Sequence, residues 1–327
     1  MTSARCPQCG FVQMARPTCR ACGAALRVPE SSPRVSLPST PPTGATTTTG
    51  VHGAGTFASS SAPPPGPPPE PMPGEPTRRL RRPFGAGRAV LIVLLYFVMQ
   101  ILGVILVGLG FGIYSGVRHP GQERAAIAAS AGPPSVLLAT MVGLVLGGLV
   151  AFRMARRSLP GPPGADSLRS IGCTAGPQRH VLLALLMGLS LVAFYLLILV
   201  QCFPPRPGDV GGPLAMAGAS PGWPRHAWAV LAVLLAPPIE EFVFRGVLFA
   251  GIARSWGPGL AAGGVTLLFI GLHLSEAFAY WPALAAISLL AIGTMAARIV
   301  ARSVGPAIVM HGAYNLGIVL WVYSFAA

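Results

Sequence analysis

The sequence predicts an all-α, polytopic membrane protein with about seven transmembrane helices around an intramembrane catalytic cavity. Hydrophobic residues make up 52% of the 327 positions and charged residues only 10%, a composition typical of multi-span membrane proteins and not of soluble enzymes. Apolar runs long enough for membrane helices begin near position 89, behind a polar tail. We therefore expect no cleavable signal peptide and a retained, cytoplasmic tail.

A cysteine-bearing head, residues 1–26, opens the chain. It holds two Cys-x-x-Cys pairs, Cys6 with Cys9 and Cys19 with Cys22, nine residues apart. Four thiolates at this spacing resemble a short zinc ribbon and predict a closed, structural zinc site. Redox pairs or free thiols are the alternative, although a cytosolic location disfavours stable disulfides. The ribbon could bind a cytosolic partner.

Residues 27–88 form a linker rich in Pro, Ser, Thr and Gly, with runs such as 41–49 and 63–69. So few apolar side chains cannot offset the entropy of ordering the chain, and we expect a disordered tether. Its last part is basic, with Arg78, Arg79, Arg81, Arg82 and Arg88. Arginines immediately before a first membrane helix favour a cytoplasmic position for that end.

The transmembrane domain, residues 89–327, contains seven apolar runs. They cover 89–115, 135–152, 181–202, 227–249, 259–274, 282–300 and 306–323. The fifth run is short, so we expect it to be tilted or buried. If all seven cross, nine arginines of this domain lie at cytosolic ends and four outside, in agreement with the positive-inside rule and with an external C-terminus. Arginines scattered in this way give no nucleic-acid-binding face.

The fourth run contains Pro237-Pro238 and then the charged residues Glu240, Glu241 and Arg245. Charged side chains inside a membrane helix cost about 2.5 to 3.5 kcal/mol each, so a functional role is the default interpretation. The proline pair predicts an interruption of the helix and a fresh helix start before Glu240. Arg245 follows Glu241 by four residues, which predicts an ion pair and leaves Glu240 free to act as a base or ligand.

Two later runs add His273, and His311 with Asn315. His311 and Asn315 are four residues apart and share one helix face. A carboxylate, two imidazoles and an amide can together deprotonate a water molecule and stabilise a tetrahedral oxyanion, which is the chemistry of peptide hydrolysis. A straight crossing by the fifth run would, however, leave His273 nearer the outer face than His311.

These residues resemble the CPBP or Abi intramembrane proteases, relatives of the type II CAAX prenyl endopeptidase. The family pattern appears as Glu240-Glu241 with Arg245, Phe269 with His273, and His311 with Asn315. The resemblance covers about 181–323, not the head or the linker. It implies a cavity open to the cytosolic leaflet, in which Glu240 and His273 activate water while His311 and Asn315 form the oxyanion site.

The resemblance leaves the catalytic metal open, since such enzymes are described both as zinc metalloproteases and as glutamate proteases. We expect a metal-independent enzyme, because the His-Glu-x-x-His signature is absent from the sequence and Asn is a poor zinc ligand. The expected substrate is a membrane-associated or lipid-modified protein or peptide, cleaved near the cytosolic face of the lipid bilayer. The composition hints at a GC-rich bacterial genome and hence at the plasma membrane.

Two further hypotheses belong to other functional classes. One is a non-catalytic membrane adaptor or immunity protein, whose zinc ribbon recruits a partner. The other is a transporter that uses Glu240 and the histidines as a proton relay. Internal repeats would favour the transporter, and the sequence shows none.

Overall fold

The computed structural model describes residues 3–5, 12–14, 84–121, 132–159, 165–206, 218–274 and 280–324. In the head, the short strands β1 (Ser3–Arg5) and β2 (Val12–Met14) pair antiparallel, with Ala4 opposite Gln13. Linker residues 27–83 lie outside the described residues, whereas residues 86–88, which the sequence places in the linker, already belong to the first membrane helix. The four cysteines of the predicted zinc ribbon also lie outside the described residues. The zinc site therefore stays a prediction.

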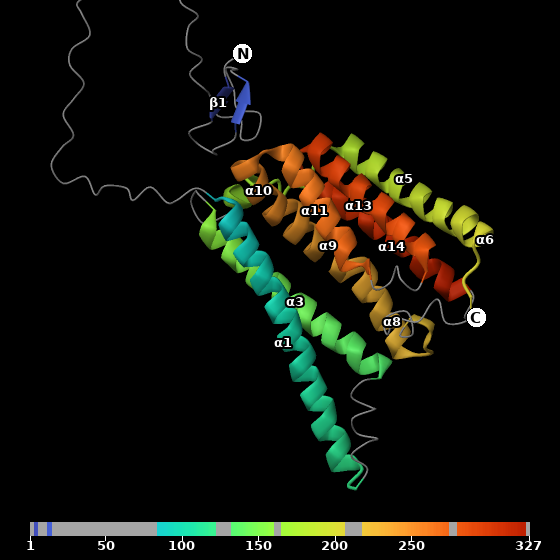
Figure 1. Ribbon diagram of the computed structural model, residues 1–327. Helices are drawn as coiled ribbons and strands as arrows, with labels where there is room; N and C mark the ends of the chain where they lie inside the picture. The colour runs from blue at the N-terminus through green and yellow to red at the C-terminus, as the bar shows by residue number, and fades with distance from the viewer. Residues whose placement is uncertain are drawn as a thin grey trace, which may run out of the picture. The chain divides into compact units, whose positions relative to one another are not determined.

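The rest of the described chain is helical, which confirms the predicted all-α polytopic fold (Figure 1). Its elements are α1 (Ala86–Arg118), α3 (Pro133–Ser158), α4 (Ala165–Arg169), α5 (Gln178–Phe194), η1 (Tyr195–Leu199), α6 (Val200–Cys202), α8 (Trp223–Val230), η2 (Leu231–Leu235), α9 (Ala236–Glu241), η3 (Phe242–Leu248), α10 (Phe249–Trp256), α11 (Pro258–Leu272), α13 (Trp281–Ala301) and α14 (Gly305–Ser324). The three η segments are π-helical turns.

Within the described residues, six helical stretches are long and apolar enough to cross a membrane: 86–118, 133–158, 178–202, 223–256, 281–301 and 305–324. The fifth predicted run is the exception, because α11 has only 15 residues. At a rise of 1.5 Å per residue it is about 22 Å long, shorter than the roughly 30 Å hydrocarbon layer. The described residues thus contain six helices of spanning length and one short apolar helix, as expected from the shortness of the fifth run.

Hydrogen bonds connect helix ends and loops at one end of the bundle. We call it the arginine end, because it contains Arg88, Arg157, Arg254, Arg298 and Arg302. The amide of Ala86 donates to Ser255 Oγ at 2.9 Å, and Arg254 donates to the Ser170 carbonyl at 2.7 Å. Gly305 N donates to the Thr174 carbonyl at 3.0 Å. The starts of α1 and α14 therefore lie together with the end of α10.

The opposite end is held by other contacts. His226 Nδ1 lies 2.7 Å from the Tyr323 hydroxyl, and the rings of Phe203 and Trp281 pack edge to face. Only Gly257 separates α10 from α11, so the chain turns back at the arginine end, and α13 starts beside Phe203 at the opposite end. Among the described residues the chain direction therefore alternates through seven passes, of which α11 is the short one. The short pass brings His273, at the end of α11, to the depth of the other polar residues, which removes the mismatch expected from a straight crossing.

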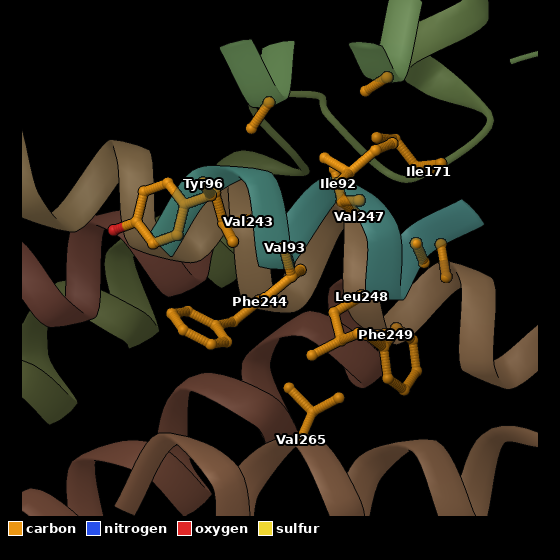
Figure 2. Packing of buried hydrophobic residues seen from close by; sticks show 14 of the residues in the cluster. Ile92, Val93, Tyr96, Ile171, Val243, Phe244, Val247, Leu248, Phe249 and Val265 are labelled. Carbon is orange, nitrogen blue, oxygen red and sulfur yellow. The ribbon is translucent and has the colours of Figure 1, made fainter. Parts of the chain in front are cut away.

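Two close-packed interfaces position the helices that carry the polar residues. In the first, α1 lies beside α3 (Figure 1), and a Cβ added to Gly103 would come within 2.5 Å of the Gly143 Cα atom. In the second, α1 packs on η3 and α10 through apolar side chains (Figure 2), among them Ile92, Val93, Val243 and Val247. Small residues thus permit close helix approach, as they commonly do in membrane bundles.

The proline pair does not break the fourth spanning helix, in contrast to the predicted fresh helix start. Residues 223–256 form one continuous helical stretch, with π-helical turns before and after Pro237 and Pro238. Proline removes an N–H donor, and in membrane helices local π geometry and side chains from neighbouring helices compensate for this loss. The kink-prone region therefore stays helical and carries the charged residues into the bundle.

Candidate active site

The buried carboxylate of Glu241 contacts one arginine and one histidine side chain. Its Oε2 atom lies 3.2 Å from Nε of Arg245, and its Oε1 atom accepts a hydrogen bond from His311 Nδ1 at 3.0 Å. Glu241 and Arg245 are both completely buried. The ion pair expected from their spacing is present, and Glu241 also holds His311 from α14.

Arg245 does not behave like the other arginines of the predicted cytosolic ends, because it is inside the bundle. Its Nη2 donates to the Ala291 carbonyl of α13 at 3.3 Å, and its guanidinium lies over the Phe269 ring at 4.1 Å from the centroid. A desolvated cation over an aromatic face gains about 2 kcal/mol. Three elements, α9, α13 and α11, therefore share the neutralisation of this buried charge.

Phe269 lies between the charged groups. Besides Arg245, its ring contacts the rings of His273 at 4.6 Å and His311 at 6.1 Å, both measured between centroids. It also packs edge to face on Phe244. The Phe-x-x-x-His element thus supplies an aromatic ring that contacts both imidazoles and the Arg245 guanidinium.

Hydrogen bonds assign the tautomers of the two histidines. His273 Nδ1 lies 2.8 Å from the Phe269 carbonyl, and a carbonyl can only accept, so Nδ1 carries the hydrogen. His311 Nδ1 faces the Glu241 carboxylate and also carries a hydrogen. In both rings Nε2 is left for contact with another group.

Glu240 precedes Glu241 on α9 but faces a different direction and is half-buried. His311 and His273 both lie within electrostatic range of Glu240. Tyr96 of α1 also lies within electrostatic range of Glu240. The structure therefore brings Glu240, His273 and His311 into one neighbourhood, with Glu241 and Arg245 packed behind His311.

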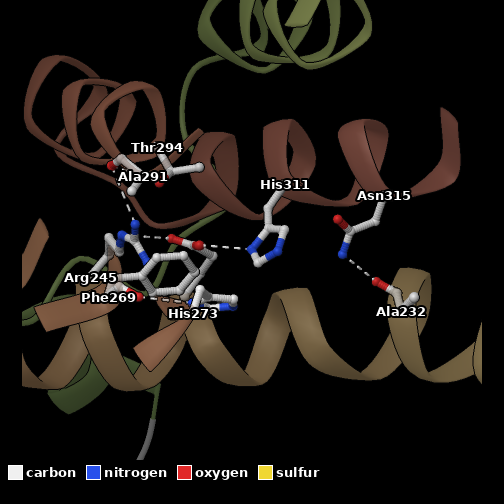
Figure 3. Close-up of polar contacts among 9 residues, drawn as sticks. Ala232, Arg245, Phe269, His273, Ala291, Thr294, His311 and Asn315 are labelled. Carbon is white, nitrogen blue, oxygen red and sulfur yellow. Dashed lines mark hydrogen bonds and ion pairs between the residues drawn. The ribbon is translucent and has the colours of Figure 1, made fainter. Parts of the chain in front are cut away.

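Asn315 is one turn further along α14 and engages a backbone group (Figure 3). Its Nδ2 atom donates to the Ala232 carbonyl at 2.7 Å. In the π-helical turn that includes Ala232, this carbonyl would accept from position 237, where proline has no N–H. One amide hydrogen of Asn315 thus replaces the N–H that Pro237 lacks. The sequence predicts only that Asn315 shares a helix face with His311, and not this backbone contact.

Arg298 of α13 is a site neighbour that the sequence patterns do not reveal. Its Nε donates to the backbone carbonyl of Arg245 at 3.0 Å, and its Nη2 donates to the Ile171 carbonyl at 2.9 Å. An arginine at the end of an apolar run usually marks the cytosolic end of a membrane helix, so the sequence gives no reason to assign Arg298 to the site. Only the three-dimensional contact distinguishes it from the exposed arginines nearby.

An apolar pocket of about 690 Å³ lies beside these residues, between α3, α9 and the start of α14. Its wall includes Gly148, Ile239, Phe242 and Ile308, together with Cys173 from the loop before α5. Ile239 immediately precedes Glu240, and Ile308 lies one turn before His311. The pocket therefore extends from the candidate site toward the arginine end.

The described residues do not form a recognisable metal centre. No group of three or more His, Cys, Asp or Glu side chains among them converges closely enough to hold a metal ion. The Nδ1 atoms of His273 and His311 are bound to a carbonyl and a carboxylate, which leaves Nε2 of each ring for another group. Histidines that bind a metal through one ring nitrogen commonly donate the other N–H in this way, so these two hydrogen bonds fit a metal-dependent site as well as a metal-independent one.

Part of the chain is similar to a known protein family. Residues 222–317 match the family described as Type II CAAX prenyl endopeptidase Rce1-like. This segment contains all the motif residues from Glu240 to Asn315 and confirms the family resemblance for that part of the chain. Neither a curated protein nor a solved structure matches the chain.

Proposed function

Because residues 222–317 form an Rce1-like domain within a multi-pass membrane protein, we propose that the protein is an intramembrane endopeptidase of the glutamate type. The observation that carries this proposal is that Glu240 lies within electrostatic range of His273 and His311. The Nδ1 atoms of these histidines are held by a carbonyl and a carboxylate. A half-buried carboxylate beside two oriented imidazoles has the groups that general base catalysis of hydrolysis needs. Family membership alone would not assign roles to individual residues.

In the proposed reaction, Glu240 removes a proton from a water molecule while the water oxygen attacks the carbonyl carbon of the scissile peptide bond. His273 accepts a hydrogen bond from the same water through Nε2. The carbonyl oxygen becomes an oxyanion, to which protonated His311 donates its Nε2 hydrogen and Asn315 its second amide hydrogen. Glu240 then transfers its proton to the amide nitrogen as the C–N bond breaks, which restores the carboxylate.

We assign Glu241 and Arg245 a supporting role. A carboxylate behind His311 stabilises the imidazolium form that the oxyanion requires, much as an acidic residue orients histidine in other hydrolases. Arg245 in turn balances the charge of Glu241 when His311 is neutral. The complete burial of this pair makes each partner dependent on the other.

The apolar pocket supports a lipid-modified or hydrophobic substrate segment. Its wall is mostly apolar, and its volume of about 690 Å³ lies within the range typical of small-molecule sites. A chain held along Ile239 and Ile308 would place an adjoining peptide bond beside Glu240. The arginine concentration at that end of the bundle favours the cytosolic leaflet, with a cytoplasmic N-terminus in the plasma membrane.

The experiment uses the full chain in liposomes of phosphatidylcholine and phosphatidylglycerol. The probes are a fluorogenic peptide ending in a prenylated Cys-aliphatic-aliphatic-X sequence and its unprenylated counterpart. We expect wild type to cleave the prenylated peptide, and Glu240→Ala and His311→Ala to abolish cleavage while exposed Arg179→Ala does not. Undiminished cleavage by Glu240→Ala, or no cleavage of either probe by wild type, would contradict the proposal.

We further propose that Cys6, Cys9, Cys19 and Cys22 bind one structural zinc ion in a head that offers a surface to a cytosolic partner. The support is the double Cys-x-x-Cys spacing. Metal analysis of the purified full chain should find about one zinc per molecule, and none after all four are replaced by serine. Zinc retained by the four-serine variant would place the metal elsewhere and overturn this assignment.

A further inference from the structure

We propose that Arg298 is a positioning residue of the active site, which acts through the backbone of Arg245 and through the loop before α5. The proposal rests on the proposed function, since it concerns the geometry of the same site. Arg298 belongs to none of the three motif elements and lies on α13, which supplies no proposed catalytic group.

Two backbone carbonyls from different parts of the chain converge on the Arg298 guanidinium. Nε donates to the carbonyl of Arg245 at 3.0 Å and Nη2 to the carbonyl of Ile171 at 2.9 Å. The side chain is almost fully buried, and its guanidinium also lies 5.2 Å from the Phe249 ring centroid. Because a guanidinium is planar and presents donors in a fixed fork, it holds both carbonyls at a defined separation.

The first carbonyl belongs to the residue whose side chain forms the ion pair with Glu241. A shift of the Arg245 backbone would move its guanidinium relative to Glu241 Oε2, which it now approaches to 3.2 Å. Glu241 in turn holds His311. Arg298 is therefore connected to the proposed oxyanion donor through one backbone contact and two side-chain contacts.

The second carbonyl belongs to a loop that also fixes the start of α14. Val304 N donates to the Gly172 carbonyl at 2.8 Å, and Gly305 N donates to the Thr174 carbonyl at 3.0 Å. Since α14 carries His311, the loop at 171–174 sets the position of this helix. Arg298 thus joins the two elements, η3 and α14, whose separation determines how Glu241 can bind Arg245 and His311 together.

Gly172 shows how closely the loop fits this arginine. Its φ angle is +81°, a left-handed conformation that favours glycine, and a Cβ added there would lie 2.5 Å from Arg298 Nη2. Replacement by alanine therefore displaces the guanidinium from the loop side without altering Arg298. The chain thus offers two independent ways to disturb the same contact.

The test compares Arg298→Lys and Gly172→Ala with wild type in the liposome assay with the prenylated fluorogenic peptide. Lysine keeps the charge but cannot bridge two carbonyls in a fork. Arg179→Lys, at an exposed arginine of the same end, and Gly121→Ala, at φ +84° in open space, are the matched controls. The measurements are kcat, KM and the pH dependence of kcat, each alongside the folded fraction.

We expect both variants to lose on the order of 10- to 100-fold in kcat, the cost of a misplacement of about 1 Å, with KM within about twofold of wild type. The pH profile of kcat should also change shape, because the distances from Glu241 to Arg245 and His311 would change. These distances affect the protonation of the groups around Glu240. Division of kcat by the folded fraction measured at each pH removes the effect of lost folded protein. The controls should keep both the wild-type kcat and the wild-type profile.

The outcomes separate this proposal from the proposed function. If wild type cleaves the probe in a Glu240-dependent manner, but Arg298→Lys and Gly172→Ala keep the wild-type pH profile, Arg298 is only a structural residue and the proposal fails. If wild type does not cleave, or Glu240→Gln cleaves equally well, the proposed function fails, and the role of Arg298 fails with it.

Discussion

His311 Nδ1 lies 3.0 Å from Oε1 of Glu241, across seventy positions of sequence. The other oxygen of the same carboxylate faces Arg245 at 3.2 Å, so one buried acidic group serves a histidine and an arginine together. This arrangement gives the two adjacent glutamates different environments. Glu241 is enclosed among fixed partners, whereas Glu240 is half-buried and lies within electrostatic range of both histidines.

The first prediction concerns the Glu241 and Arg245 pair. Glu241→Gln should lower the free energy of unfolding by about 3 to 5 kcal/mol, because it leaves a buried guanidinium without its counter-charge. The double variant Glu241→Met with Arg245→Met removes both charges and should lie within about 2 kcal/mol of wild type. Unfolding in mixed micelles with increasing SDS measures both values. A double variant that is less stable than Glu241→Gln would contradict the mutual dependence of the pair.

The second prediction concerns the contact of Asn315 with the Ala232 carbonyl. Asn315→Ala should cost about 1 to 3 kcal/mol of unfolding free energy, because a partly buried carbonyl loses its donor. In a Pro237→Ala background the restored N–H can bond the same carbonyl, so the cost should fall below about 1 kcal/mol. Equal costs in the two backgrounds would show that Asn315 does not compensate for the proline.

The third prediction concerns the crossing of α1 and α3. Gly103→Ala should destabilise the protein by about 1 to 3 kcal/mol, because the added Cβ would overlap the Gly143 backbone. Gly108→Ala, on the same helix with open space around it, is the control and should be neutral or stabilising by up to about 1 kcal/mol. Thermal unfolding of the two variants in one detergent compares them directly, and equal shifts would argue against this helix contact.

The fourth prediction concerns the thiol of Cys173, in the loop before α5. Burial raises the pKa of Cys173 to about 11, although the nearby positive charge of Arg298 acts in the opposite direction. Since only the thiolate reacts, alkylation by iodoacetamide should be slow at pH 7.5 and should rise about tenfold per pH unit up to about pH 11.

Residue-resolved mass spectrometry can follow this reaction, and the same thiol in unfolded protein is the control. Native Cys173 should react more than tenfold more slowly than the unfolded thiol at pH 7.5, because its thiolate fraction is lower. Equal rates at that pH would show that the loop does not bury the thiol.

Much of this architecture follows from local sequence patterns. The apolar runs mark the spanning helices because length and composition alone decide whether a helix can cross a bilayer. The four-residue spacing of Glu241 and Arg245 predicts their ion pair, since both residues lie on one helix face. The shortness of α11 is also visible in the sequence.

The contacts that join distant segments could not be predicted in this way. Nothing local distinguishes Arg298 from an arginine at a membrane surface, and the bond between His311 and Glu241 depends on how α14 packs against α9. The sequence predicts a break at Pro237 and Pro238, but the helix continues through them. The π-helical turns and the Asn315 contact that permit this arise from tertiary packing, which local sequence does not reveal.

The central claim is that Glu240, and not its neighbour, is the base that activates water. The most direct measurement compares kcat for the prenylated fluorogenic peptide, together with the unfolding free energy, in wild type, Glu240→Gln and Glu241→Gln. We predict that Glu240→Gln loses at least about 10³-fold in kcat at nearly wild-type stability, whereas Glu241→Gln loses both activity and stability. A folded Glu240→Gln protein that cleaves the peptide at the wild-type rate would contradict the account.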